Sequence, residues 1–311
     1  MSDLKAGAPF QHSGRNIPQL MQTLLYALLP GILASLWFFG FGILVNIAIA
    51  VLFAVFAEAA MPRLRNRNIR SQLSDRSVCV TAVLFAAAIP PESPGLLVAL
   101  GIVFAVVIAK HLYGGLGQNP FNPAMCGYAM LLLAFPLEMT GTILTTQESA
   151  PPLFASGSET AWKVVNISYL LGGLFILYKK IISWHIPLAI IATILVLSAV
   201  FYAPGSIAIY GTPYLHLFGS ATMIGVFFIA TDPVSAATTR PGKLIYGIII
   251  GASIYSIRVW GSYLDSIAFA VLFGNFCAPL LDHYCRPRIF GHGLRGKSGK
   301  QLPYKAPINR E

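Results

Sequence analysis

Long apolar runs dominate the chain and alternate with short polar segments. The run from Ile43 to Ala60 has Glu58 as its only charged residue, and the run from Leu96 to Ala109 has none. A helix that crosses a bilayer needs about 20 mostly apolar residues. The pattern predicts an all-α membrane bundle of about ten transmembrane helices, at residues 18–38, 42–61, 77–90, 95–112, 123–138, 163–178, 184–203, 214–231, 243–260 and 265–284.

Two of these spans are expected to be irregular. The third is short and ends in Pro90-Pro91, and the fifth begins beside a proline-rich loop. Proline removes a backbone donor, and an interrupted span is tolerated only where it packs inside protein or lines a cavity. We therefore expect both spans to lie within the bundle.

A weak internal repeat divides the chain. TAVLFAAAIPP at 81–91 resembles MIGVFFIATDP at 223–233, and KHLYGG at 110–115 resembles IRVWGS at 257–262. The third and eighth spans run in opposite directions, and five spans followed by five inverted spans are a common plan of transporters. The predicted parts are an N-terminal segment 1–17, a first five-helix repeat 18–138, a short periplasmic loop 139–162, a second five-helix repeat 163–284 and a basic tail 285–311.

Composition and charge agree with lipid as the solvent. Of the 311 residues, 56% are hydrophobic and 10% are charged, whereas soluble domains carry about 25% charged residues. With a cytoplasmic N-terminus, all of the 21 Lys and Arg residues except Lys163 and Arg258 fall on the cytoplasmic side. Cytoplasmic loops are enriched in these residues, so this one-sided distribution predicts cytoplasmic termini, and it explains the net charge of +10 by a bilayer partner, not by nucleic acid.

The stretch HLYGGLGQNPFNPAM at 111–125 is the first candidate site. Three glycines and two Asn-Pro steps lie there between two apolar spans. Glycine permits positive φ and proline restricts the residue before it, so the backbone must leave the helix and expose polar groups. Those groups fit either a site for a cofactor, an ion or a partner, or a tight turn with Asn-Pro caps. The candidate residues are Lys110, Tyr113, Gly115, Asn119 and Asn122.

Two acidic residues are candidates for an ion path. Asp232, in IATDPVSAATT at 229–239, lies where an apolar span ends, and Glu58 lies near the cytoplasmic end of the second span. Acidic residues at such depths are often functional. We nevertheless favour a new helix N-cap for Asp232. For Glu58 we favour an ion pair with the arginine-rich segment 63–76, and for Arg258 an outer-edge pair with Asp265.

Signatures of soluble enzymes and of metal sites are missing from the sequence. The four cysteines form no C-x-x-C pair, and no Cys/His cluster has zinc or iron–sulfur spacing. P-loop, G-x-S-x-G and H-E-x-x-H motifs are also absent. We therefore expect no catalytic residue and no metal site on this chain, and no removable signal peptide.

Several segments resemble the signatures of the D-type membrane protein (RnfD) of the Rnf ion-translocating electron-transport complexes. They are AKHLYGGLGQNPFNPAM at 109–125, GSATMIGVFFIATDPVSAATT at 219–239 and AFAVLFGNFCAPLLDHYCRPRIFGH at 268–292, together with LWFFGFG, AIPP and WHIP. The resemblance runs from about residue 10 to 292. A more distant similarity is to the B-type membrane protein (NqrB) of the sodium-pumping NADH:quinone oxidoreductase.

The resemblance implies a function. Rnf complexes pass electrons between ferredoxin and NAD and couple this transfer to sodium or proton movement across the bacterial inner membrane. The D-type protein of these complexes resembles a membrane scaffold with an inverted-repeat fold like that of urea transporters. The resemblance also implies the Rnf proteins of types A, B, C, E and G as partners. The repeat alone also fits a stand-alone small-solute channel, and a purely structural membrane anchor is a further alternative.

The resemblance also implies FMN esterified to a threonine in an outer-face loop. Family members usually have a long loop with a segment like S-x-A-T-P-L, whereas the closest match in this chain is SAPPL at 149–153. Pro151 stands where the modified threonine would be, and proline has no hydroxyl to esterify. We therefore expect no covalent FMN there, and noncovalent FMN or riboflavin stays open.

Other threonines lack the expected surroundings. Thr145, Thr146 and Thr160 lie in the same short loop without the neighbours of the family motif. Thr160 is the fallback attachment residue. Thr222, in the sequence GSAT, superficially resembles a flavinylation motif but falls in an apolar span, so it is kept only as a candidate cofactor contact.

Overall fold

The computed structural model is a bundle of helices throughout the residues that it describes, which are 16–66, 73–140, 159–202, 212–261 and 266–285. Strands are absent from these residues. Five helices are long and apolar enough to cross a membrane by length and composition: α1 (Ile17–Phe39), α2 (Gly42–Leu64), α8 (Glu159–Tyr178), α13 (Arg240–Trp260) and α14 (Ile267–Tyr284). The prediction of an all-helical, polytopic membrane protein is confirmed.

The other predicted spans are shorter or divided helices. They are α4 (Ser77–Ala88); α5 (Gly95–Phe104) with the π-helix η1 (Ala105–His111); α6 (Pro123–Ala134) with α7 (Pro136–Thr140); α9 (His185–Val200); and α11 (Pro213–Phe218) with α12 (Thr222–Ile224) and the π-helix η4 (Gly225–Ile229). Each predicted span thus coincides with one helix or a run of helices in the described residues. The number of complete crossings stays a prediction.

Two helix boundaries differ from the sequence prediction. Helix α8 begins at Glu159, so the end of the predicted loop 139–162 is helical. A carboxylate in the first turn stabilises the positive end of the helix dipole, which favours this earlier start. The predicted span 214–231 is broken between α11 and α12. Hydropathy missed that break because the residues on both sides of it are apolar.

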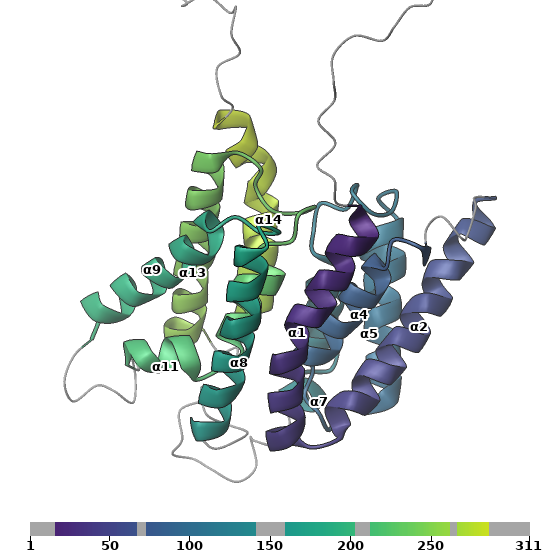
Figure 1. The fold of residues 1–311 in the computed structure, drawn as a ribbon, viewed down its shortest axis with the longest axis horizontal. Helices are drawn as coiled ribbons and strands as arrows, with labels where there is room; N and C mark the ends of the chain where they lie inside the picture. Colours follow the sequence, from purple (N-terminus) through teal and green to yellow (C-terminus); the bar gives the residue numbers. More distant parts are fainter. Residues whose placement is uncertain (1–15, 67–72, 141–158, 203–211, 262–265, 286–311) are drawn as a thin grey trace, which may run out of the picture.

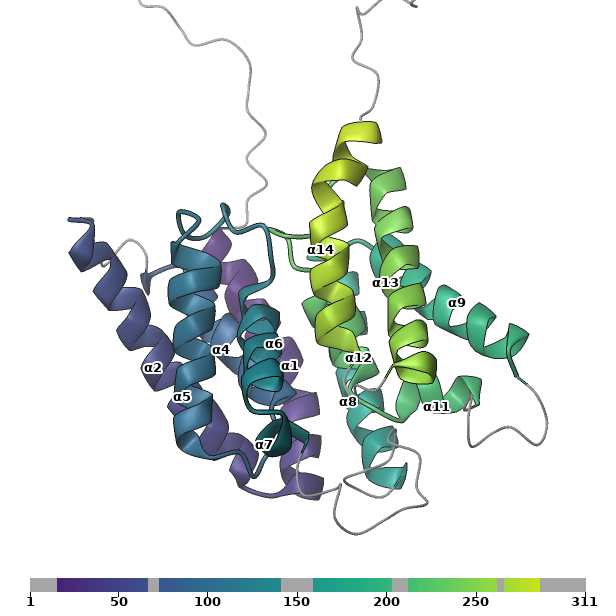
Figure 2. The same cartoon turned by 180° about the vertical axis from the view of Figure 1, so that it is seen from behind.

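The helices form two halves that lie side by side (Figure 1, Figure 2). One half contains α1, α2, α4, α5 and α6, and the other contains α8, α9, α11, α13 and α14. Helix α1 packs against α8 and runs in the opposite direction, and α6 packs against α14. These contacts join the first predicted span to the sixth and the fifth to the tenth, and the inverted repeat itself stays a prediction.

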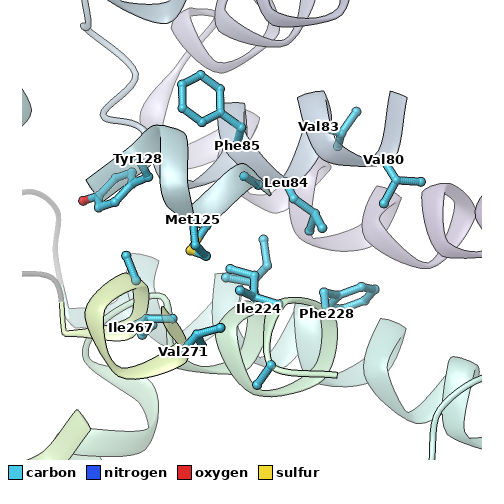
Figure 3. Packing of buried hydrophobic residues seen from close by; sticks show 14 of the residues in the cluster. Val80, Val83, Leu84, Phe85, Met125, Tyr128, Ile224, Phe228, Ile267 and Val271 are labelled. Carbon is cyan, nitrogen blue, oxygen red and sulfur yellow. The ribbon is translucent and has the colours of Figure 1, made fainter. Parts of the chain in front are cut away.

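Buried apolar side chains fill the space between the halves. Figure 3 shows Leu84 and Phe85 of α4 and Met125 of α6 on one side, with Ile224 and Phe228 on the other. Lipid tails are as apolar as these side chains, so close packing holds the helices together more than removal from solvent does. The broken helices α12 and η4 therefore contribute directly to the contact between the halves.

Glycine allows α1 and α8 to approach closely. A Cβ added at Gly172 would lie 2.0 Å from the backbone oxygen of Ala27. That oxygen belongs to a helix backbone and cannot turn aside. Small residues at such contacts are typical of helices packed in membranes.

The described basic residues gather mainly at one end of the bundle. Helix α1 begins and α14 ends at the upper end of Figure 1. The end of α2, the end of η1 and the start of α13 lie at this same end, with Arg63, Arg65, Lys110, Arg240 and Lys243. The start of α8 and the end of α13, which carry Lys163 and Arg258, lie at the opposite end.

We predict that the basic end faces the cytoplasm, because cytoplasmic loops are rich in Lys and Arg. Tyr178 is exposed at the end of α8, and Leu137 is exposed on α7 at the opposite end. In a chain whose four cysteines are replaced by serine, Tyr178→Cys should react with a membrane-impermeant maleimide in inverted vesicles only. Leu137→Cys is the matched position and should react in spheroplasts only. The opposite labelling would place both termini outside.

Candidate functional site between the two halves

The first candidate stretch leaves its helix through a π-turn and three glycines. Lys110 and His111 form the last turn of η1. Such π-turns are rare and occur frequently at functional sites. Gly114, Gly115 and Gly117 then take φ values of 122°, 105° and 87°, in the region that favours glycine. These three glycines turn the chain back toward α6. Residues with a Cβ atom would adopt these φ values only with backbone strain.

Asn122 links this stretch to the second half. Its side-chain oxygen accepts a hydrogen bond from the amide of Met125 at 3.3 Å and so caps α6, with Pro123 at the first helical position. Its side-chain amide donates to the carbonyl of Ile229 at 3.3 Å, at the end of η4. One side chain therefore satisfies backbone groups at two helix ends, one in each half.

Asp232 closes a turn immediately after η4. Its carboxylate accepts hydrogen bonds from the Ser235 hydroxyl at 2.7 Å and the Val234 amide at 3.5 Å. Thr239 caps α13 by accepting from the amide of Gly242, so the expected role of Asp232 as the new helix cap is wrong. Asp232 is too far from the start of α13 and instead stabilises the turn before it.

Both candidate stretches border one cavity of about 110 Å³. Lys110, Asn119 and Asn122 line it from the first half, and Thr231 and Asp232 line it from the second. The rest of the wall is mostly apolar and comes from α1, α4, η4 and the segment after α8. This volume holds several water molecules but is smaller than the roughly 300–1,000 Å³ of most sites for organic ligands.

Asn119 lines this cavity and carries an unused acceptor. Its side chain is 4% exposed, and its amide donates to the Phe121 carbonyl at 2.9 Å. Its side-chain oxygen has no hydrogen-bond partner among the described residues. An unmet buried acceptor costs about 1–3 kcal/mol. Asp232 also has no ion pair among the described residues, so the wall offers two sources of the oxygen ligands that hard cations prefer.

A buried charge network lies against this wall. The Nζ atom of Lys110 is 2.8 Å from Oε1 of Glu58 and 3.0 Å from the Ser77 hydroxyl. The other Glu58 oxygen lies 3.0 Å from Nε2 of His111. Glu58 is 1% exposed, and Lys110 and His111 are each 2% exposed. These charges are paired within the protein, as burial in a membrane bundle requires.

The partners of Glu58 differ from the sequence prediction. Among the described residues, Glu58 pairs with Lys110 and His111 and with no arginine of the segment 63–76. Arg65 instead donates to the carbonyl of His111, the last residue of η1, at 2.8 Å. The physical reason is position: Glu58 lies one to two turns below the arginines on α2, where η1 packs.

The remaining predicted site residues lie away from the cavity wall. Tyr113 is 49% exposed, and Gly115 is buried in the loop. Thr222 is fully buried, and its hydroxyl donates to the carbonyl of His216 at 2.9 Å. The structure therefore brings together Lys110, Asn119, Asn122 and Asp232, with Glu58 behind Lys110.

The cavity is too small for FMN, and no step through a flavin is derived from it. Thr160 is exposed on the first turn of α8, whereas Thr145, Thr146 and Pro151 lie outside the described residues. Flavin attachment therefore stays a prediction. Within the described part of the chain, no group of three or more His, Cys, Asp and Glu residues could hold a metal ion.

A second buried polar network, around Arg258, was missed by sequence reasoning. Arg258 is 8% exposed, and its guanidinium donates to the Thr222 hydroxyl at 2.9 Å and to the carbonyl of His216. The available signal was the repeat, because Arg258 falls in the stretch 257–262 that resembles KHLYGG. Asp265, the partner expected for Arg258, lies outside the described residues.

We predict that Asn122→Ala lowers the stability of the folded protein by about 1–2 kcal/mol. The substitution removes the cap of α6 and one of the two donors to the Ile229 carbonyl, which keeps only the Asp232 amide. Asn122→Ser keeps a capping oxygen but cannot reach Ile229, so it should cost less. The thermal midpoint of the purified protein, followed by size-exclusion chromatography after heating, measures both effects. An unchanged midpoint in Asn122→Ala would contradict this role.

Comparison with known proteins gives the family. The chain matches the model of the NQR2, RnfD, RnfE family over residues 4–291. It is 42% identical to the D component of the ion-translocating oxidoreductase complex of Vibrio cholerae, with 92% of this chain and 99% of the relative covered. The proteins of the same name from Yersinia enterocolitica and Aliivibrio salmonicida are 40% and 39% identical, and cover 92% of this chain. Those alignments cover 98% and 97% of the two relatives.

The alignment also bears on the length of the chain. It runs over 346 positions for the Vibrio cholerae relative, more than the 311 residues of this chain, so the relative carries insertions. This length difference agrees with a shortened loop. The family model covers almost the whole chain, and the relatives are near 40% identical over nearly their full lengths. The chain therefore belongs to the NQR2, RnfD, RnfE family.

Proposed function

We propose that this chain is the D-type membrane component of a redox-driven ion pump and that the cavity is a step of its ion path. The names of the relatives, which are components of ion-translocating oxidoreductase complexes, support the pump. The ion path rests on one observation: Asp232 and Asn119, whose side-chain oxygen has no partner among the described residues, line the same cavity between the two halves. No observation on the described residues favours a stand-alone small-solute channel.

The family resemblance supports the finer parts of the proposal. Ferredoxin and NAD are the proposed redox partners of the complex, and Rnf proteins of types A, B, C, E and G are the proposed neighbours in a bacterial inner membrane. This chain contributes the helical scaffold and an ion site. We assign it no catalytic residue, and we propose that, without a covalent FMN on this chain, electrons pass through centres on the neighbouring proteins.

The chemistry of the cavity suits a small cation. A cation that enters a bilayer protein loses water ligands, which oxygen atoms of the protein replace. The Asp232 carboxylate supplies charge and the Asn119 oxygen supplies a neutral ligand. Sodium would use both groups as ligands, with water completing its shell. A proton would be carried by the Asp232 carboxylate itself.

We predict that Asp232→Asn lowers ion transport per transferred electron by about tenfold or more. The substitution keeps the size of the side chain but removes the charge, and a charge-assisted contact is worth more than the roughly 1.4 kcal/mol that a tenfold change requires. Inverted vesicles with the whole complex, driven by reduced ferredoxin and NAD, permit parallel measurement of ²²Na⁺ uptake and acidification.

Glu138→Gln is the matched control for this experiment. It also removes one carboxylate, but from an exposed position on α7. Transport in this control should equal that of the unchanged complex. Coupled transport that is also unchanged in Asp232→Asn, with both probes, would remove the cavity from the ion path and leave the chain as a membrane anchor.

We propose further that the loop 140–161 carries no covalent FMN, on the strength of Pro151 in place of the modified threonine. Intact mass spectrometry of the purified protein should give the mass of the bare chain, and its gel band should show no flavin fluorescence. An added mass of one FMN would contradict this proposal. Thr145→Val, Thr146→Val and Thr160→Val would then identify the attachment residue by loss of that mass.

A further inference from the structure

The cavity wall carries two opposite charges. Among the described residues that line it, only Lys110 and Asp232 are charged. A cation drawn toward Asp232 is repelled by the ammonium of Lys110 unless a third group balances that charge. The cavity alone therefore has no net negative charge, and its suitability for a cation depends on what lies behind its wall.

Glu58 supplies the balancing charge without reaching the cavity. Its Oε1 atom is 2.8 Å from Nζ of Lys110, it is 1% exposed, and it is not among the described residues that line the cavity. Its other oxygen is held at 3.0 Å by Nε2 of His111. The carboxylate of Glu58, on α2, is thus held by two residues of η1 and is not part of the cavity wall.

Ser77 completes this arrangement. The ammonium of a lysine has three donors. Glu58 and the Ser77 hydroxyl take two of them, at 2.8 Å and 3.0 Å. Ser77 is itself fixed, because its amide and its hydroxyl both donate to the Asp75 carboxylate at 2.8 Å. The ammonium group of Lys110 is therefore positioned between Glu58, Ser77 and the cavity.

We infer that Glu58 sets the charge of the cavity by neutralising Lys110 and is not itself an ion ligand. This inference rests on the proposed function of the cavity as an ion step. Without Glu58, Lys110 would present its full charge at the wall and would compete with the cation for Asp232. Glu58 is thus a positioning residue that acts on the ion through Lys110.

Removal of both charges separates this role from that of a ligand. If Glu58 binds the ion directly, removal of Lys110 cannot repair the loss of Glu58. If Glu58 only balances Lys110, removal of both charges restores the net charge of the wall. The informative variants are therefore Glu58→Gln, Lys110→Met and the double variant, with Glu138→Gln on exposed α7 as the control.

The experiment uses the whole complex in inverted vesicles driven by reduced ferredoxin and NAD. It measures ions moved per electron with ²²Na⁺ and with a pH-sensitive dye, and the half-saturating sodium concentration where ²²Na⁺ is taken up. Glu58→Gln should lower the ion-to-electron ratio, or raise the half-saturating concentration, by about tenfold or more, because an unbalanced buried like charge opposes binding strongly. The double variant should return to within about threefold of the unchanged complex, which is about half of a tenfold effect on a logarithmic scale.

The opposite result would have a different pattern. A double variant as impaired as Glu58→Gln would overturn the inference and make Glu58 a ligand or a structural residue. Loss of one partner of a buried pair is costly, so Glu58→Gln alone can fail to assemble. In that case Lys110→Met is the deciding variant. The inference requires that its half-saturating sodium concentration is unchanged or lower, or that its ratio of protons to electrons is unchanged. A higher half-saturating sodium concentration, or a lower ratio of protons to electrons, in Lys110→Met overturns the inference.

Failure of this inference is distinguishable from failure of the proposed function. The proposed ion step fails if Asp232→Asn leaves coupled transport unchanged. The charge balance fails if Asp232→Asn impairs transport while the double variant shows no recovery relative to Glu58→Gln. The two results come from the same vesicles and the same probes, with assembly checked by size-exclusion chromatography.

Discussion

A bilayer offers no water to backbone groups, so each break in a helix of this chain must find its hydrogen-bond partners within the protein. Asparagines from other elements perform this task. Asn122 meets the carbonyl at the end of η4, and Asn46 of α2 donates to the Pro90 carbonyl beyond the end of α4 at 3.0 Å. Asn166 of α8 donates to two carbonyls and accepts from one amide around the break between α11 and α12. The breaks, and the contact between the halves that depends on them, therefore exist only in the assembled bundle.

The same breaks produce the site. Where η1 and η4 end, the chain turns through polar stretches instead of continuing to the surface as helix, and these stretches leave a small cavity between the halves. A buried charge is costly unless it is paired. Near this cavity, Lys110 is paired with Glu58, and Glu58 is also paired with His111. Asp232 has no such pair in the described part of the chain. Its carboxylate can therefore interact with an ion, whereas the charges of Lys110 and Glu58 are already paired with each other.

Each half of the bundle holds a buried cation at a helix end, but the two surroundings differ. Lys110, at the end of η1, holds the Ser77 hydroxyl at the start of α4, and Arg258, near the end of α13, holds the Thr222 hydroxyl at the start of α12. In each half, a cation from one helix end thus fixes the start of a broken or short helix. Of these two networks, only that of Lys110 borders the cavity, so the candidate site lies beside one of them and not the other.

The sequence by itself determined the helical membrane class, the positions of the helices and the two stretches that leave the membrane helices, because hydropathy, proline and glycine act locally. It also placed Lys110, Asn119, Asn122 and Asp232 among the candidates. Only the tertiary structure decided which of them share a cavity. It also decided that Glu58 pairs with Lys110 and His111, and that Asn166 forms hydrogen bonds around the break between α11 and α12. Those partners are more than 30 residues apart in the chain, and no local pattern encodes a contact that arises when separate helices pack.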